Sequence, residues 1–252
     1  MLIIGIRALL DNDEPILLSQ LTDARKHFPG AKIVLAVCGD DPSEKIKGLC
    51  DKVLYYSQKP SGLTEPLRII IDHAKEHNAN ELIITDGDDQ FYFSEIRRLY
   101  ELGKSSGYDA VIPKRVRKSL FFQDGNYDRV LVEDCENILF RKAYPNGIKD
   151  PQPGVEIMLN RDTISCLSME NVPCWIGDIV ITYLLLYNRR TITEPEIKTR
   201  EQSKTHMNVE REFEKISQMQ NYFGINIDEA IPEGNLLEIY EIFGKNFKSD
   251  KN

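Results

Sequence analysis

Three carboxylates follow one short apolar segment, and their types and spacing suit phosphate chemistry. Residues 82–85 read as a buried strand that runs directly into Asp86-Gly87-Asp88-Asp89. Carboxylates this close repel one another unless a cation lies among them, and Mg²⁺ binds through one or two carboxylates together with substrate phosphates. The carboxyl ends of strands are also where α/β sheets bind ligands. The segment therefore predicts a metal-bridged phosphate site.

Other structures are compatible with such a segment. An Asp-Gly pair is typical of a hairpin turn, but the residues after Phe91 have helical rather than alternating spacing. An EF-hand loop needs Gly at its sixth position and Glu at its twelfth. Counted from Asp86, those positions hold Phe91 and Arg97. A solvated acidic loop without function stays open as an alternative.

A second carboxylate stands alone in an apolar run. Asp178 lies within Trp175-Ile-Gly-Asp-Ile-Val-Ile181, where burying an unpaired charge is costly. A carboxylate in such a place is a candidate general base, which would take a proton from an attacking hydroxyl. The same residue is also suited to cap the helix expected over residues 176–187. Both interpretations stay open.

One histidine motif predicts different chemistry. His73-Ala-Lys-Glu76-His77 matches the inverted zinc-protease pattern, and a helix would place both histidines on one face. His77 is equally suited to a helix C-terminus. The sequence offers no evident third ligand, so a protease is disfavoured.

Strands alternate with helices in the first half of the chain, which predicts parallel βαβ units and a doubly wound sheet. Residues 114–154 carry several turn signals and read as irregular. A strand, an apolar helix and a strand broken by Pro195 are expected after them. The expected strands are 2–6, 32–37, 53–56, 82–85, 109–112, 155–159 and 191–197, and the expected helices are 15–28, 43–49, 64–77 with Thr64 as N-cap, 176–187, 209–222 and 236–243.

Composition narrows the class of protein. The 252 residues are 41% hydrophobic and 29% charged, as in ordinary globular proteins. A net charge of -8 argues against nucleic-acid binding. No apolar run reaches the roughly 18 residues that span a bilayer, and the N-terminus does not read as a signal peptide. Five cysteines without Cys-x-x-Cys spacing favour reduced thiols and a cytoplasmic location.

Five features in order resemble the nucleotide-sugar transferases of the GT-A fold, and glycosyltransferase family 2 in particular. The resemblance covers about residues 1–206, and it implies a Rossmann-like, mostly parallel central sheet flanked by helices. Residues 207–252 would then form a C-terminal helical extension. The first strand lacks the usual proline, since Arg7 follows Ile6. The features are Asn12-Asp13-Glu14, Asp40-Asp41, Asp86-x-Asp88-Asp89, Asp178, and Glu194-Pro-Glu-Ile197 followed by Arg200-x-x-Ser203-Lys204.

The resemblance implies a metal-dependent, inverting glycosyltransferase. It would move a sugar from a nucleotide-sugar donor to a sugar or lipid-linked acceptor, through a hydroxyl or phosphate. Mg²⁺ or Mn²⁺ would be held by Asp86 and Asp88, with His206 as a third ligand, and Asp178 would be the base. The residues expected to bind nucleotide or donor are Arg7, Asp40, Asp41, Asp89, Arg115, Arg200 and Lys204.

Two other functions compete with this one. A sugar-phosphate nucleotidyltransferase usually carries a Gly-rich loop with Arg and Lys after the first strand. Here Gly5-Ile-Arg7 is followed by Ala-Leu-Leu, which counts against that class. The second motif also departs from the usual Asp-Asp-Gly-Ser, since Asp40-Asp41 is followed by Pro42-Ser43. The altered first and second motifs fit a nucleotide-sugar-binding protein that has lost turnover.

Overall fold

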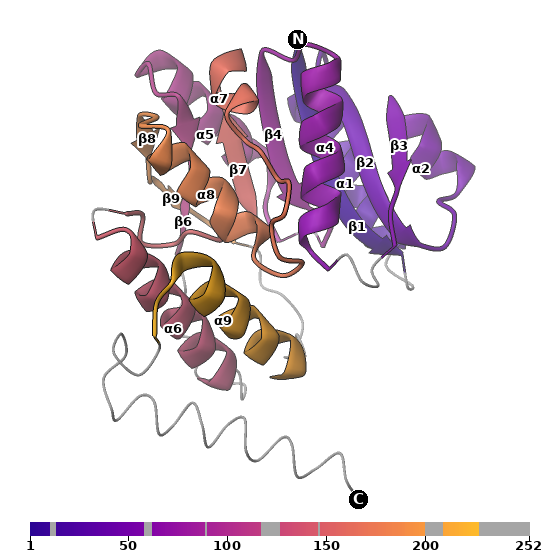
Figure 1. Cartoon of the computed structure of the whole chain (residues 1–252). Coiled ribbons are helices and arrows are strands. Elements are labelled where there is room, and N and C mark those ends of the chain that lie inside the picture. Colours follow the sequence, from indigo (N-terminus) through magenta and orange to yellow (C-terminus); the bar gives the residue numbers. More distant parts are fainter. Residues whose placement is uncertain are drawn as a thin grey trace, which may run out of the picture. The chain divides into compact units, whose positions relative to one another are not determined.

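The computed structural model describes residues 1–10, 14–57, 62–88, 90–116, 127–145, 147–199 and 209–226 (Figure 1). The chain divides into two compact units, of which the first comprises Met1–Val116 with Asp150–Glu201 and the second Arg117–Lys149 with Gln202–Asn252. The expected domain boundary at residue 206 stays a prediction.

A seven-stranded sheet forms the centre of the first unit, in the order β3-β2-β1-β4-β7-β5-β8. The first four strands in this order are parallel to one another. β7 runs antiparallel to both β4 and β5, and β5 and β8 are parallel. The mostly parallel sheet expected from the sequence is thus confirmed, with one reversed strand that was not predicted. The bounds are β1 Leu2–Leu10, β2 Lys32–Gly39, β3 Lys52–Tyr55, β4 Glu81–Asp86, β5 Ala110–Val111, β7 Val155–Met158 and β8 Ile192–Thr193.

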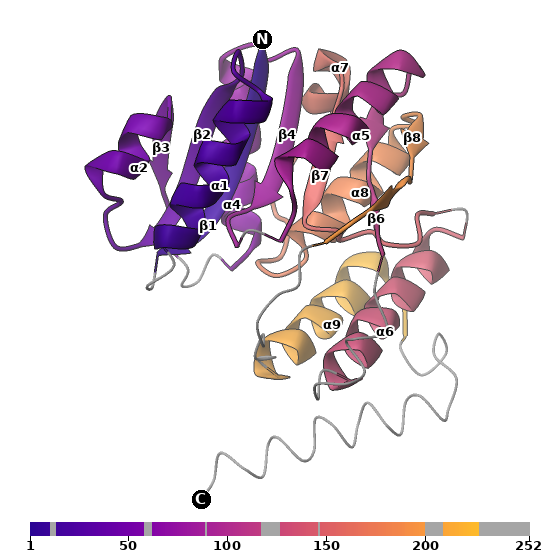
Figure 2. The same ribbon diagram turned by 180° about the vertical axis from the view of Figure 1, so that it is seen from behind.

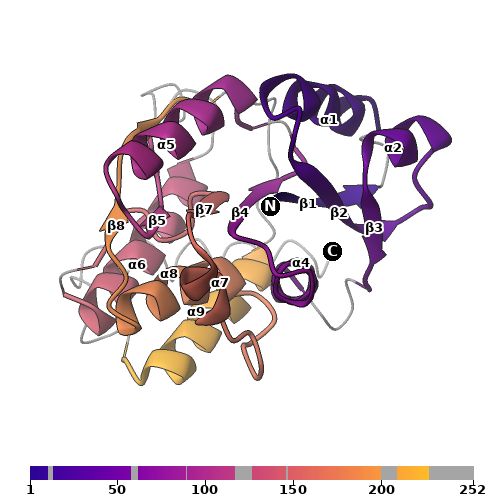
Figure 3. The ribbon, with the colours of Figure 1, turned by 90° about the horizontal axis from the view of Figure 1, so that it is seen from above.

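Helices cover both faces of this sheet (Figures 1 and 2). Seen from above, α1 and α5 lie on one side of it, and α4, α7 and α8 lie on the other (Figure 3). The bounds are α1 Glu14–His27, α2 Glu44–Leu49, α4 Thr64–Glu76, α5 Phe93–Ser105, α7 Arg161–Ser165 and α8 Gly177–Tyr187.

Successive side chains of β1 point to opposite faces of the sheet. One face packs in the hydrophobic core, and the other carries Arg7. Ile4 and Ile6 belong to the hydrophobic core, together with side chains of α1 and α5. Gly5 and Arg7 point to the opposite face, because successive strand residues alternate. A Cβ on Gly5 would lie 2.3 Å from Cγ2 of Ile70 in α4. The glycine therefore lets α4 pack directly on the strand that carries Arg7.

The structure departs from the sequence expectations in three places. Residues 127–143 form a helix, α6, within the segment expected to be irregular. The predicted last strand is divided at Pro195 into β8 and β9 (Glu196–Ile197), and β9 pairs with β6 (Lys114–Arg115). Thr64 begins α4 but is not its N-cap, since its hydroxyl donates to the carbonyl of Pro173. The helix expected at 236–243 lies outside the described residues.

In the second unit, α6 (Tyr127–Ala143) packs against α9 (Val209–Phe223). The pair buries an ion pair in which Nζ of Lys215 lies 3.0 Å from Oε2 of Glu136. Phe140 and Phe223 meet edge to face at 6.2 Å. Among the residues described, no helix has both the length and the apolar character needed to cross a bilayer.

Candidate active site

Arg7 is the centre of a buried charge cluster at the carboxyl edge of the parallel strands. It lies beside Asp86 in the register of β1 and β4, and its Nε donates to Oδ1 of Asp86. Its two terminal nitrogens donate to the two oxygens of Asp178, with Nη2 3.0 Å from Oδ2. Only 6% of the Arg7 side chain is exposed. One guanidinium thus joins two carboxylates that the sequence analysis had selected independently.

Asp178 is not the N-cap of its helix. It is the second residue of α8, whose N-cap is Ile176, and both of its oxygens accept hydrogen bonds from Arg7. A carboxylate in the first turn is favoured by the helix dipole. The bidentate pair fixes the orientation of the Asp178 carboxylate.

Glu156 is a third carboxyl group in the cluster, and the sequence analysis missed it. It pairs in register with Ile84 of β4, and its side chain is completely buried. Within the described residues, neither of its oxygens has a hydrogen-bond partner. Burial, followed by the nearby Asp178 carboxylate, raises the pKa of Glu156 well above its ordinary value, while Arg7 opposes the shift. Burial thus favours the protonated form of Glu156 over the charged form. The signal that would have found it is a single acidic residue inside the apolar strand Val155-Glu-Ile-Met158.

Close backbone packing surrounds Asp86. The amide of Gly87 donates to the carbonyl of Arg7 at 2.7 Å. Gly154 has a positive φ of 79°, and a Cβ there would lie 2.8 Å from Oδ2 of Asp86. Burial raises the pKa of Asp86 to about 6, with Asp88 and Asp178 adding to the shift and Arg7 opposing it. Ionising Asp86 is thus less favourable than ionising an exposed aspartate, and a nearby cation would lower that cost.

The donor set fits a hard divalent cation. Asp86 is 30% exposed and Asp88 is exposed, with its Oδ1 accepting from the amide of Gln90 at 3.1 Å. Carboxylate oxygens are the ligands that Mg²⁺ and Mn²⁺ prefer. The cluster also holds more carboxyl groups than the single guanidinium of Arg7 can neutralise. In the described part of the chain, Asp86 and Asp88 do not belong to a preformed group of three acidic, His or Cys ligands. Substrate phosphates would have to complete the coordination, as is usual for Mg²⁺.

The second acidic motif lies at the end of β2, outside the Arg7 cluster. Asp40 and Asp41 are both exposed. Asp41 accepts from Nζ of Lys47 at 2.7 Å and from the Tyr55 hydroxyl at 2.6 Å. The bond from Lys47, followed by that from Tyr55, lowers the pKa of Asp41. Nucleotide binding by Asp40 and Asp41 stays a prediction.

Tyr56 is an aromatic side chain that the sequence analysis did not single out. It follows β3 and is half-buried, close enough to Cys38, Arg7 and Asp86 for their charges to act on it. Burial raises the pKa of Tyr56 to about 12. A neutral aromatic ring at this edge is suited to stacking against a nucleotide base.

Arg115 is already engaged by a carboxylate of its own. Its Nε and Nη2 donate to the two oxygens of Asp150 at 2.8 and 2.9 Å, and the amide of Asp150 donates to Oε1 of Glu194 at 2.8 Å. These bonds tie β6 to the segment before β7. Donor binding by Arg115 stays a prediction, and it would have to share or break this pair.

Four predicted site residues cannot be placed. Asp89, Arg200, Lys204 and His206 lie outside the described residues, so their roles stay predictions.

The chain is similar to known proteins in its structure and not in its sequence. No protein-family model matches it, and no curated protein sequence matches it. Solved structures of glucosyl-3-phosphoglycerate synthase from Mycobacterium tuberculosis do match the structure of this chain. One, with Mn²⁺, UDP-glucose and phosphoglyceric acid, has a TM-score of 0.66 at 14% identity, over 90% of this chain and 80% of that chain. Another, with Mn²⁺, UDP and glucosyl-3-phosphoglycerate, has a TM-score of 0.66 at 15% identity, over 90% and 81% of the two chains. A third, with Mg²⁺ and UDP, has a TM-score of 0.65 at 14% identity, over 90% and 80%.

At this low sequence identity, the similarity shows that the chains share a fold. The match covers 90% of this chain. The chain's sheet contains the reversed strand β7 and the carboxylates at the end of β4. The chain therefore has the same fold as these synthases, the GT-A fold.

Proposed function

We propose that this protein is a glycosyltransferase that moves a sugar from a nucleotide-sugar donor to an acceptor with the help of Mg²⁺ or Mn²⁺. The observation that carries the proposal is the cluster of Arg7 with Asp86, Asp178 and Glu156 at the carboxyl edge of a GT-A sheet. Buried carboxyl groups in excess of their counter-charge are costly for stability and typical of functional sites.

The metal ion would be held by Asp86 and Asp88. When bound, such an ion neutralises the charge that develops on the departing diphosphate. The raised pKa of Asp86 supports this placement, because a cation relieves the cost of ionising a buried carboxyl group.

Arg7 would act as a positioning residue for Asp178. While Asp178 is paired with Arg7, both of its carboxylate oxygens are occupied by hydrogen bonds. A diphosphate offers Arg7 more negative charge than a carboxylate does, and Arg binds phosphate oxygens bidentately. We propose that the donor draws Arg7 toward its diphosphate, which frees Asp178 to accept the proton of the acceptor hydroxyl.

The donor, the acceptor and the stereochemistry follow as finer proposals. UDP-glucose is the first donor to test, and a phosphorylated hydroxy acid the first acceptor, because the structurally similar synthases are named with UDP-glucose and phosphoglyceric acid. Sugars and lipid-linked hydroxyls are the next acceptors. A single base that takes the proton of the acceptor hydroxyl fits direct displacement, and we therefore propose inversion. We also propose a cytoplasmic location and no nucleic-acid partner, on the basis of the free thiols and the net charge of -8.

One observation favours a second candidate. Arg7 is paired with both the proposed metal ligand and the proposed base, as expected of a nucleotide-sugar-binding protein that no longer turns over. Donor binding without transfer would support it.

Turnover separates the two candidates. The parent protein would be incubated with Mn²⁺, nucleotide sugars and a panel of acceptors, and release of nucleoside diphosphate would be measured. We expect acceptor-dependent release that Asp86→Asn abolishes. Asp72→Asn is the matched control, since Asp72 is a 45% exposed carboxylate on α4 paired only with Arg68 among the ion pairs of the described residues, and it should retain turnover. Binding without release in the parent would favour the non-catalytic protein.

A further inference from the structure

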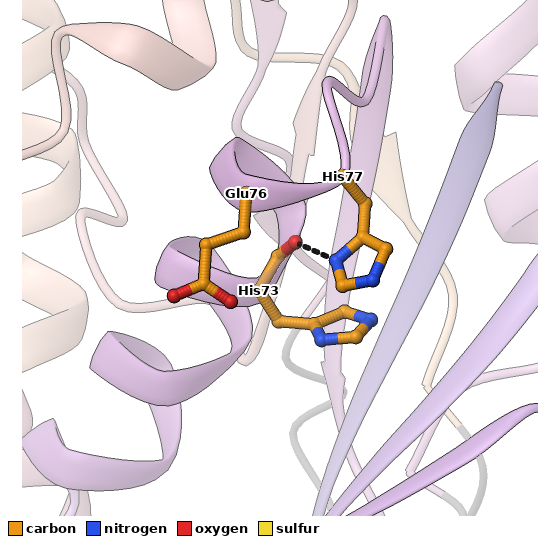
Figure 4. Close-up of side chains that lie close together, drawn as sticks. All are labelled: His73, Glu76 and His77. Atoms are coloured by element: carbon orange, nitrogen blue, oxygen red, sulfur yellow. Dashed lines mark hydrogen bonds between the residues drawn. The ribbon is translucent and has the colours of Figure 1, made fainter.

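A second group of metal-ligating side chains lies on the last turn of α4. It consists of His73, Glu76 and His77, called here the histidine cluster (Figure 4). α4 begins beside the carbonyl of Cys174, near the start of α8, and its 13 residues extend for roughly 20 Å. The histidine cluster therefore lies at the opposite end of the helix from the carboxyl edge and takes no part in the Arg7 cluster.

The ligand atoms of the histidine cluster are already close together. One from each residue lies within 4.8 Å of the others. The two imidazole rings lie side by side, with centroids 4.0 Å apart and planes tilted by 31° (Figure 4). In a tetrahedral zinc site each ligand atom lies about 2.0–2.2 Å from the ion. The side chains would have to rotate to bring their ligand atoms into that range.

The tautomer of His77 is fixed in the form that a metal requires. Its Nδ1 lies 2.9 Å from the carbonyl oxygen of His73. A carbonyl oxygen can only accept, so Nδ1 carries the hydrogen, and in the neutral ring Nε2 carries the lone pair. Histidine ligands of metals almost always donate their other ring hydrogen in this way. The main chain of the helix thus supplies the supporting bond.

His73 is half-buried, and its ring lies against the ring of His77. Glu76 is exposed and would supply a negative charge to the ion.

We propose that His73, Glu76 and His77 bind one divalent transition-metal ion of the zinc class. Imidazole nitrogens select Zn²⁺, Cu²⁺ or Ni²⁺ over Mg²⁺, which prefers oxygen ligands. The site would be distinct in position and in ligand chemistry from the one at Asp86 and Asp88. A bound ion would join two successive turns of α4 and stabilise its C-terminal end.

Calorimetry with Zn²⁺ on the full chain, in excess Mg²⁺, tests the proposal. We expect one Zn²⁺ per chain. His73→Asn and His77→Asn should each raise the Kd at least about tenfold, because even supporting residues of metal sites cost that much. His27→Asn is the matched control. His27 also ends a helix and faces an acidic residue four positions away, with its Nε2 3.3 Å from Oδ1 of Asp23, but it lacks a second histidine.

Two further measurements make the outcome decisive. Asp86→Asn should bind Zn²⁺ as the parent does, so the result does not depend on the proposed transferase activity. Zn²⁺ should raise the Tm of the parent but not that of the double variant His73→Asn/His77→Asn, because a ligand that binds only the folded state stabilises it. Equal Zn²⁺ affinity in the parent and the double variant would overturn the proposal and point to the cysteines instead. Absence of binding by the folded parent would overturn it as well.

Discussion

Replacing Arg7 by Met should destabilise the protein strongly and make its stability depend on metal. The substitution keeps an unbranched side chain and removes the single cation shared by Asp86 and Asp178. Removing one partner of a buried ion pair costs about 3–5 kcal/mol. Most of this should come from Asp178, which is 13% exposed, since Asp86 is 30% exposed and solvent screens its charge.

The expected loss can be measured by thermal unfolding. In proteins of this size 1 kcal/mol shifts the Tm by about 2–4 °C, so Arg7→Met should lower it by roughly 6–20 °C. Mn²⁺ should recover part of the loss, because it replaces the missing charge at Asp86. The gain with Mn²⁺ should therefore be larger in Arg7→Met than in the parent.

Arg115→Met provides the matched control. Arg115 and Asp150 form a comparably buried pair, 10% and 6% exposed, and neither is a proposed metal ligand. This variant should also melt at a lower temperature, but its response to Mn²⁺ should equal that of the parent. The reasoning would be refuted if the Tm of Arg7→Met lay within about 2 °C of the parent's. Such a shift corresponds to a change of less than about 1 kcal/mol in the free energy of unfolding. Equal gains with Mn²⁺ in both arginine variants would refute it as well.

Three further predictions concern catalysis, pH and the second unit. Asp178→Asn keeps the size of the side chain but cannot take a proton, so it should bind donor nearly as the parent does and lose transfer by roughly 10²-fold or more; near-full transfer by this variant would exclude Asp178 as the base. Mn²⁺ affinity should fall as the pH is lowered through about 6, where Asp86 takes up its proton. The metal-free protein should lose stability as the pH rises through the same range, because the folded state binds that proton more tightly than the unfolded state. A Mn²⁺ affinity that does not fall at low pH, or a metal-free stability that rises with pH through this range, would contradict the assignment. Lys215→Met removes the amine that pairs with the buried Glu136 carboxylate and should lower the free energy of unfolding by about 3–5 kcal/mol. Adding Glu136→Leu to this variant should restore part of the loss, as measured by thermal unfolding.

Elements with strong local signals were predictable from the sequence. β4 is an apolar run that ends in carboxylates, and α4 and α5 have clear helical spacing, so their positions agree with the structure within a few residues. α6 was missed because the turn signals at both of its ends outweighed its interior. Tyr127–Ala143 contains no Gly or Pro, which was the available signal for a helix.

Contacts between distant segments were not predictable in the same way. The sequence analysis selected Arg7, Asp86 and Asp178 separately, but their pairing depends on the register of β1 against β4 and on the place where α8 begins. The role of Glu156 depends on the reversed direction of β7. Strand direction is set by the connections and by the rest of the sheet, rather than by the four residues of the strand.

Calorimetry of nucleotide-sugar binding, with and without Mn²⁺, tests the central claim most directly. The parent should bind a nucleoside-diphosphate sugar only when Mn²⁺ or Mg²⁺ is present. Asp88→Ala should lose this metal-dependent binding while keeping the circular dichroism spectrum and Tm of the parent, because Asp88 is exposed. Asp72→Ala, on the exposed side of α4, should bind as the parent does. Unchanged metal-dependent binding by a folded Asp88→Ala variant would contradict the account.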